Sequence, residues 1–372
     1  MPSNQQTYNS EGMKILVTGG AGFIGSCFVR MALKTTLQTT LPFGRGSDLE
    51  IANLDKLTYA GNLENLAPVA GDPRYQFIKG DICDTELVNQ IFDTFRPDAV
   101  VHFAAESHVD RSIFSPLPVF ETNLRGTFTL LEAARTKGIG RFVHVSTDEV
   151  YGSIEAPHEA DENFPLDASS PYSAGKAGSD LLALAYYKTY KVPVVVTRAS
   201  NNYGPYQFPE KLIPLMISNA LDDKPLPLYG DGQQIRDWLY VEDHCRAILA
   251  ILEKGRDGQV YNIGGNRSLP NKTVVEKILE ATGKPESLIQ YVADRPGHDR
   301  RYALSSAKLT RETGWVPRMD FETGLAATVD WYRTNQDWMK RVKSGEYQAF
   351  YAQNYGNREG RSAGKLTSAG NG

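Results

Sequence analysis

The stretch KILVTGGAGFIG, residues 14–25, decides the predicted fold. Its first four residues are a short, mainly apolar run that predicts a buried β-strand, and an apolar helix is expected from about Phe23. Between them lies a Gly-x-x-Gly-x-x-Gly repeat, at Gly19, Gly22 and Gly25. Such glycines can form a simple tight turn. Between a strand and a helix, however, they let the backbone approach a pyrophosphate, which the N–H groups of the helix N-terminus stabilise.

Strand and helix patterns alternate outward from this unit. Further strands are expected at 49–55, 75–79, 98–103 and 142–145, and helices at 84–95, 117–137 and 172–190. Strands that alternate with helices form a parallel sheet, and near-continuous apolar strands fit a sheet that is covered on both faces. We therefore predict an α/β fold with a doubly wound, Rossmann-type parallel sheet.

An acid at the end of the second strand would complete a dinucleotide site. Asp55 ends that strand, and the inserted stretch at 35–48 accounts for its unusual distance from the glycines. A carboxylate there accepts hydrogen bonds from a ribose diol and repels a 2′-phosphate, so we expect NAD rather than NADP. Asp81 ends the third strand, where it could reach the adenine or, equally well, cap the next helix.

The pattern changes after about residue 200, where Pro and Gly become frequent and strict alternation ends. We expect residues 13–200 to form a NAD-binding Rossmann-type domain. Residues 201–355 are expected to form a smaller, mixed, mainly substrate-binding portion over the carboxyl edge of the sheet. The polar segments 1–12 and 356–372 are expected to be flexible, and 35–48 to be a surface insertion.

Composition limits the partners of the chain. Of its 372 residues, 41% are hydrophobic and 23% are charged, and the formal net charge is −4. With no long basic run we expect no nucleic-acid partner, and with no apolar stretch of spanning length we expect no membrane partner. The N-terminus lacks a signal pattern, and the three cysteines are too far apart to form a metal-binding pair. We therefore expect free thiols, no metal and a cytoplasmic location.

A tyrosine and a lysine form a second candidate site. Tyr172 and Lys176 are four residues apart, so on a helix they share one face. A nearby ammonium favours the phenolate and lowers the pKa of the phenol, which gives a base that takes a hydroxyl proton while hydride leaves to NAD. The alternative is an ordinary surface pair. The preceding nucleotide turn and the strand that ends in Ser146-Thr147 favour the functional interpretation.

Two adjacent acids, Asp148 and Glu149, follow that strand in the stretch VSTDEVYG, residues 145–152. Mutual repulsion and burial can hold a proton on one of two neighbouring carboxyl groups. A solvated turn with a helix cap is the alternative. In a continuing strand the two side chains would point to opposite faces, so the functional interpretation requires the strand to end by Thr147.

The glycine turn, Asp55 and the Tyr172/Lys176 pair resemble the extended short-chain dehydrogenase/reductase family. Further motifs closely resemble its nucleotide-sugar 4,6-dehydratases, namely AAESHVDRS (104–112), STDEVYG (146–152), NNYGPY (201–206), RDWLYVEDH (236–244) and DRPGHDRRY (294–302). The similarity runs from about Met13 to Tyr355. The sequence departs from the family pattern in two places, the insertion at 35–48 and the polar tail, and neither lies within a motif.

The resemblance implies NAD as cofactor and dTDP-glucose as substrate, which is converted to dTDP-4-keto-6-deoxyglucose and water. Tyr172 and Lys176 would oxidise C4, with Thr147 hydrogen-bonded to the C4 oxygen. Glu149 would take the C5 proton, and Asp148 would protonate the departing C6 hydroxyl. Hydride would then return to C6, so that the cycle is redox-neutral.

The resemblance also implies two sets of binding residues. The expected cofactor contacts are Gly19, Gly22, Phe23, Ile24, Gly25, Asp55, Lys56, Thr58, Asp81, Ile82, Ala104, Ala105, Ser107, Thr122, Tyr172, Lys176 and Asn202. The expected substrate contacts are His108, Thr147, Asn201, Lys211, Leu212, Pro227, Tyr229, Arg236, Asn271, Arg295, His298 and Tyr355. Alternative roles are a salt-bridge partner of Asp237 for Arg236 and simple packing for Tyr355. His102 and His144 lie within strands and are expected to be core residues.

We further expect a homodimer. Helices 117–137 and 172–190 would offer apolar residues that the sheet cannot cover, namely Leu181, Leu182, Leu184 and Ala185 in the second, and the resemblance implies that two copies pair these helices as a four-helix bundle. Two rival functions remain open at this point. An epimerase or decarboxylase of the same family would share Tyr172 and Lys176 but usually lacks the Thr-Asp-Glu run, and a NAD-binding regulator would need neither residue.

Overall fold

The computed structural model describes residues 12–34 and 49–343. The expected insertion at 35–48, the segment before residue 12, the polar tail and Tyr355 all lie outside the described residues.

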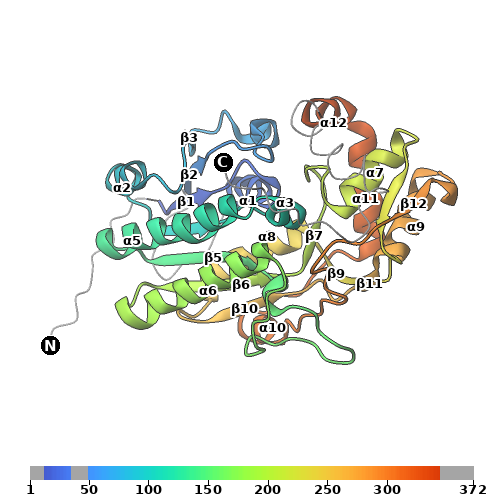
Figure 1. The fold of residues 1–372 in the computed structure, drawn as a ribbon. Helices are drawn as coiled ribbons and strands as arrows, with labels where there is room; N and C mark the ends of the chain where they lie inside the picture. Colours follow the sequence, from blue (N-terminus) through green and yellow to red (C-terminus); the bar gives the residue numbers. More distant parts are fainter. Residues whose placement is uncertain (1–11, 35–48, 344–372) are drawn as a thin grey trace, which may run out of the picture.

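A seven-stranded sheet forms the centre of the molecule, in the order β10-β6-β5-β4-β1-β2-β3, and all of its pairings are parallel (Figure 1). Its strands are β1 (Lys14–Thr18), β2 (Glu50–Asp55), β3 (Tyr75–Lys79), β4 (Ala99–His102), β5 (Arg141–Thr147), β6 (Val194–Ala199) and β10 (Val260–Ile263). The predicted doubly wound parallel sheet is confirmed. The strand order reverses between β1 and β4, which is where ligands bind in such sheets.

Both faces of the sheet are buried because successive residues of a strand point to opposite sides. In β1, Ile15 and Val17 join one hydrophobic cluster, while Leu16 joins the other. Helices α1 (Phe23–Lys34) and α8 (Val241–Lys254) pack together on the first side. The opposite side is covered by α2 (Thr85–Thr94), α5 (Thr127–Lys137) and α6 (Pro171–Tyr190), of which α5 and α6 run side by side (Figure 1).

The helix predicted at 117–137 is helical throughout but is not one regular α-helix. Leu117–Val119 (α4) leads into a π-helical turn, η2 (Phe120–Gly126), before α5 begins. The wider turn brings Asn123 to the loop after β4, where its side chain accepts from the Glu106 N–H and donates to the Glu106 carbonyl. The irregularity therefore supports the loop that follows β4 at the carboxyl edge of the sheet.

The rest of the chain after residue 200 builds a smaller portion beside the sheet. Its strands are β7 (Asn201–Tyr203), β8 (Leu226–Tyr229), β9 (Ile235–Tyr240), β11 (Ser268–Pro270) and β12 (Ile289–Val292). They form a β11-β9-β7 sheet and a β12-β8 pair. These strands pack with α7 (Leu212–Leu221), α9 (Asn271–Thr282), α11 (Phe321–Thr334) and α12 (Gln336–Val342) around a third hydrophobic cluster. Within the described ranges, no helix is long and apolar enough to cross a membrane.

Candidate active site

The turn between β1 and α1 requires glycine at two positions. Gly19 has φ +73°, and a Cβ there would lie 2.6 Å from the Ala104 backbone nitrogen. A Cβ at Gly25 would lie 2.3 Å from the Gly19 carbonyl oxygen, so the first turn of α1 could not pack on the loop. The backbone is therefore bare where α1 faces a cavity, as the approach of a pyrophosphate requires.

Asp55 holds this turn from the end of β2. One of its carboxylate oxygens accepts from the Ala21 N–H at 2.9 Å, and the other accepts from the Leu57 N–H at 2.8 Å. Burial raises the pKa of Asp55, while these two donors oppose the rise. Asp55 also lines the cavity, so one side chain both shapes the glycine turn and presents an acceptor to a ligand.

Asp81 does not cap the next helix. The cap of α2 is Asp84, whose carboxylate accepts from the Leu87 N–H. Asp81 instead pairs with Lys56 at 2.6 Å and lines the cavity. Of the two roles predicted for Asp81, the helix cap is therefore not observed, and the contact with the adenine stays a prediction.

The residues expected to contact the cofactor all line this one cavity at the carboxyl edge of the sheet, from Gly19 to Asn202. Thr147, Asp148 and Glu149 line it as well. Among the described residues, no group of His, Cys, Asp and Glu could hold a metal ion. The cavity therefore places a dinucleotide cradle and a pair of acids in one space.

Helix α6 carries Tyr172 and Lys176 to the floor of the cavity. Ser170 begins the helix as one partner of a capping box with Ser173. Lys176 Nζ donates to the Val145 carbonyl at 2.8 Å. Burial lowers the pKa of Lys176 to about 8, and Asp180, one turn further along the helix, opposes that fall.

The phenol of Tyr172 does not behave as the sequence predicts. Its pKa is raised, first by burial and then by the charge of Glu149, while a hydrogen bond with Thr147 opposes the rise. Lys176 is not among the groups that lower it, because the ammonium is directed to the Val145 carbonyl. Thr147 is therefore the side chain in this structure that favours the phenolate.

The turn that carries the two acids has the geometry that the functional interpretation requires. Strand β5 ends at Thr147, which caps a short 3₁₀ turn, η3 (Asp148–Tyr151). The Thr147 hydroxyl accepts from the Glu149 N–H and lies 3.3 Å from Asp148 Oδ1. Both carboxyl groups therefore face the cavity instead of opposite sides of the sheet.

Their surroundings push the two acids toward different protonation states. Burial raises the pKa of Asp148 well above its usual range, and the charge of Glu149 raises it further. Burial also raises the pKa of Glu149, but Arg295, Lys211 and Arg236 oppose that rise. We infer that Asp148 holds the shared proton and that Glu149 is ionised.

A buried polar network lies beneath this turn. Asp180 on α6 contacts Arg198 Nε at 2.8 Å and His144 Nε2 at 3.3 Å. Arg198 donates to the hydroxyl of Tyr151, the last residue of η3, at 2.8 Å. The network links the helix that bears Lys176 to the turn that bears the acids. The prediction that His144 is a core residue is confirmed, since it is completely buried.

His102 is likewise a core residue, because its ring nitrogens contact the hydroxyls of Thr18 and Thr127 at 2.7 and 3.0 Å.

A second cavity opens beside the first, and Glu149, Asn201, Glu210 and Lys211 line both. The other residues expected to contact substrate that line it are His108, Leu212, Pro227, Tyr229, Arg236, Asn271, Arg295 and His298. Thr147 lines the first cavity instead. Among the described residues, the amide oxygens of Asn201 and Asn271 are buried without a hydrogen-bond partner, so each can accept from a ligand.

The alternative role of Arg236 as a partner of Asp237 is not observed. The Asp237 carboxylate accepts from the N–H groups of Gly265 and Arg267, both at 2.7 Å. Arg236 donates to the Asp299 carbonyl and lies over the Tyr302 ring, with its guanidinium carbon 4.1 Å from the ring centre. Its guanidinium therefore faces the second cavity.

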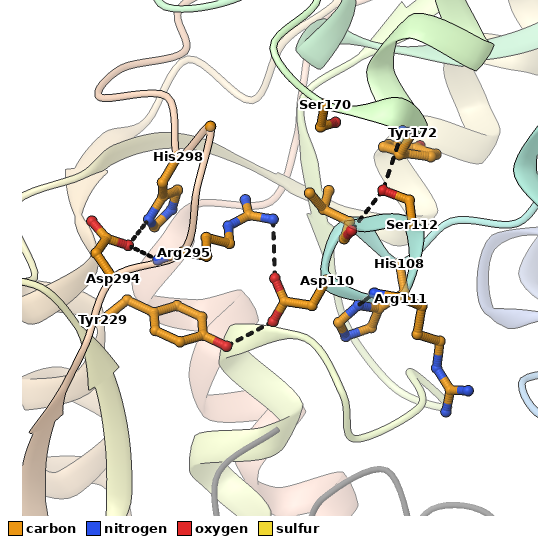
Figure 2. Close-up of polar contacts among 12 residues, drawn as sticks. His108, Asp110, Arg111, Ser112, Ser170, Tyr172, Tyr229, Asp294, Arg295 and His298 are labelled. Atoms are coloured by element: carbon orange, nitrogen blue, oxygen red, sulfur yellow. Dashed lines mark hydrogen bonds and ion pairs between the residues drawn. The ribbon is translucent and has the colours of Figure 1, made fainter. Parts of the chain in front are cut away.

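Figure 2 shows polar contacts of residues in and next to the lining of this cavity. Asp110 lies between Tyr229 and Arg295, and Asp294 contacts both His298 and the Arg295 backbone N–H. Sequence reasoning missed Asp110, although it lies within the motif at 104–112. It also missed Glu210, which is buried beside Arg111 and whose pKa burial raises to about 7. The position of Asp110 within a recognised motif was the available signal, whereas Glu210 lies outside the motifs and had none.

Comparison with known proteins places the chain among nucleotide-sugar enzymes. The model of the GDP-mannose 4,6 dehydratase family matches residues 16–328. The chain belongs to this 4,6-dehydratase family. A dTDP-glucose 4,6-dehydratase of Salmonella typhimurium is 50% identical, with 93% of this chain and 100% of the relative covered.

Solved structures agree with this family assignment. A dTDP-glucose 4,6-dehydratase from Streptomyces venezuelae, solved with NAD bound, is 52% identical with a TM-score of 0.84, over 89% of this chain and 100% of that one. A UDP-glucose 4-epimerase from Thermus thermophilus, in complex with NAD, is 34% identical with a TM-score of 0.78, over 87% of this chain and 100% of that one. The 4,6-dehydratase is the more similar of the two.

Asp55 generates a prediction on cofactor choice. Asp55→Ala should weaken NAD binding by roughly tenfold or more and narrow the preference for NAD over NADP, because a charged acceptor is lost. Asp55→Asn is the matched control. Its amide oxygen can still accept from the glycine turn, so it should narrow the preference with a smaller loss of NAD affinity. Titration of both variants with NAD and NADP measures this, and an unchanged preference in both would remove Asp55 from the ribose site.

Proposed function

We propose that this chain is a NAD-dependent dTDP-glucose 4,6-dehydratase, a hydro-lyase that forms dTDP-4-keto-6-deoxyglucose and water. The observation that carries the proposal is the η3 turn, because it presents two adjacent acids to the cavity that also holds Tyr172, and burial raises the pKa of Asp148 further than that of Glu149. We divide the chain as the sequence predicts, with residues 13–200 mainly for the dinucleotide and 201–355 mainly for the substrate. Helix α8 and strand β10 then return to the first layer.

The residues around the first cavity fit NAD. The glycine turn brings the N-terminus of α1 to this cavity, where its N–H groups suit a pyrophosphate, and Asp55 offers an acceptor for a ribose diol. When bound, NAD supplies the acceptor for the C4 hydride and returns that hydride to C6. NAD is regenerated in each turnover, so a deep cradle that retains it suits the reaction.

In each chemical step, a side chain takes a proton from one group of the sugar or gives a proton to it. Tyr172, held by Thr147, takes the C4 hydroxyl proton, and the hydrogen bond with Thr147 favours its phenolate. The C4 ketone makes the C5 proton acidic, and Glu149 removes it as the ionised member of the pair and returns a proton to C5 when hydride is delivered to C6. Asp148, which holds the shared proton, gives it to the departing C6 hydroxyl as water leaves.

The second cavity provides the charge that a nucleoside diphosphate sugar requires. Arg236, Arg295 and Lys211 are cations beside the acids, and a guanidinium matches phosphate oxygens through its fork of donors. The same cations lower the pKa of Glu149, so the substrate site and the base are electrostatically linked.

The rival functions account for less of the site. An epimerase only takes a hydride and returns it, so it needs Thr147, Tyr172 and Lys176 but no acid and base for elimination. A NAD-binding regulator would have no use for Asp148, whose burial costs free energy. The pair at 148 and 149 therefore favours the dehydratase.

Glu149→Gln separates the half-reactions. The amide keeps the size of the side chain but cannot accept the C5 proton, while the groups that oxidise C4 remain. With dTDP-glucose, the variant should accumulate enzyme-bound NADH, lose exchange of the C5 deuteron with solvent, and turn over roughly 10²–10⁴-fold more slowly. Absorbance of the bound cofactor and mass spectrometry of the recovered sugar measure both effects.

Two matched variants show which step is lost. Tyr172→Phe impairs the first hydride transfer, so little NADH should appear. Asp148→Asn should still oxidise C4 of the sugar and exchange the C5 hydrogen with solvent, but elimination of the C6 hydroxyl should be slow. Near-normal turnover of Glu149→Gln would reduce the pair to a simple turn and remove the main support of the proposal.

We also propose a homodimer formed through α5, α6 and the turns before α5. Large apolar side chains that would otherwise face water gather there, namely Leu117, Phe120, Phe128 and Leu181, with exposed fractions of 67%, 43%, 47% and 58%. Leu182 and Leu184 instead pack toward the sheet. An apolar face of this kind on two adjacent helices suits a second copy of the chain.

Leu181→Glu tests the dimer. A charge at the centre of a buried interface is costly, so sedimentation at micromolar concentration should shift from dimer to monomer. Val316→Glu is the control, since Val316 is 48% exposed but lies outside these helices. A wild-type monomer, or a dimer that persists in Leu181→Glu, would contradict the proposed interface.

A further inference from the structure

A buried acid lies in the cavity that has to receive a diphosphate. Asp110 is 4% exposed and lines the second cavity together with Arg236, Arg295 and Lys211. An anion at this position repels an anionic ligand, and burial makes its own charge costly. The role of Asp110 in substrate binding therefore needs a separate physical reason.

Asp110 joins two segments that come from distant parts of the chain. The Tyr229 hydroxyl donates to one of its oxygens at 2.7 Å, and Arg295 Nη1 contacts the other at 3.3 Å (Figure 2). Tyr229 ends β8, and Arg295 follows β12, the strand that pairs with β8. Asp110 itself lies on α3 (Val109–Phe114), just after β4 of the large sheet. The three side chains therefore tie the smaller portion to the large sheet.

The same short helix also contacts the catalytic helix. The Ser112 hydroxyl accepts from the Tyr172 N–H at 3.2 Å and donates to the Val109 carbonyl at 2.6 Å. Asp110 and Ser112 thus fix two groups from one helix, the cation expected to meet the diphosphate and the backbone of the catalytic tyrosine. The distance between the protein groups expected to contact the two ends of the substrate therefore depends on this helix.

We infer that Asp110 is a positioning residue that holds Arg295 and Tyr229 ready for the diphosphate of the substrate, at a fixed place relative to Tyr172. This inference rests on the proposed function. A long arginine side chain loses rotamer freedom when it binds a ligand, and prior ordering lowers that cost. Ordering by Asp110 then outweighs the repulsion between its charge and the phosphates.

Asp110 also limits what else Arg295 can contact. Arg295 interacts electrostatically with both Asp110 and Glu149. Without Asp110, the guanidinium would turn more fully to Glu149, where it would both leave the phosphate site and stabilise the ionised base. The positive charge would remain in the cavity but would no longer be correctly placed.

Binding of dTDP to the NAD-loaded enzyme gives a test in which the two explanations predict opposite signs. If charge alone matters, Asp110→Ala removes a repelling anion and should bind dTDP more tightly. If Asp110 positions Arg295 and Tyr229, Asp110→Ala should bind dTDP more weakly, by roughly tenfold or more for the loss of charge-assisted hydrogen bonds. Calorimetric titration measures the difference.

Asp231→Asn is the control for a change in charge. Asp231 is an exposed acid paired with Arg300 at 2.8 Å, and its variant should leave dTDP affinity within about twofold of the wild type. NAD affinity should stay unchanged in Asp110→Ala, because a general loss of structure would also disturb the first cavity. The melting temperature should fall, because Tyr229 and Arg295 lose a buried partner. If Asp110→Ala does not fold, Asp110→Asn is measured instead, with a smaller weakening expected.

Equal or tighter dTDP binding by the folded variant would overturn the positioning role and leave the proposed function intact. A wild-type enzyme that fails to bind dTDP would count against the proposed function itself. The two failures are therefore distinguishable.

Discussion

The structure depends most on the burial of two neighbouring carboxyl groups, Asp148 and Glu149, on one short turn. Two charges in that position would repel each other and lose their hydration. The surroundings act unequally on the two groups, because Arg295, Lys211 and Arg236 oppose the rise in the pKa of Glu149, whereas at Asp148 the charge of Glu149 adds to burial and only Arg236 among these cations opposes it. The pKa of Asp148 is therefore raised further than that of Glu149, which suits Asp148 to the role of acid and Glu149 to the role of base.

The fold keeps this turn in place from both sides. Strand β5 ends at Thr147, and that residue caps the turn and also reaches Tyr172. Below the turn, Arg198 joins Tyr151 to Asp180 on the catalytic helix. The parallel sheet brings the glycine turn of β1 to the same edge, so that cofactor, base and acids share one cavity. The acids and bases are then set at fixed separations by rigid elements rather than by loops.

Much of this arrangement could be predicted from sequence. The apolar strands, the glycine spacing around Gly19 and the motif at 146–152 each carry a local signal, and they led to the sheet, the cradle and the acid pair. Features that depend on tertiary contacts could not be predicted. The π-helical turn at Phe120–Gly126 exists because Asn123 reaches the loop at Glu106. The direction of the Lys176 ammonium toward the Val145 carbonyl likewise has no signature in the spacing of Tyr172 and Lys176.

We infer that Asp148 is protonated and Glu149 is ionised at neutral pH. Infrared difference spectroscopy of the NAD-loaded enzyme measures this directly, since a protonated carboxyl group has a carbonyl stretch that a carboxylate lacks. We expect the wild type to show at neutral pH a band that is absent from Asp148→Asn and present in Glu149→Gln, which assigns it to Asp148 and separates it from Glu210, whose pKa is also raised. Wild-type and Asp148→Asn spectra that are identical in the carbonyl region would show instead that Asp148 is ionised.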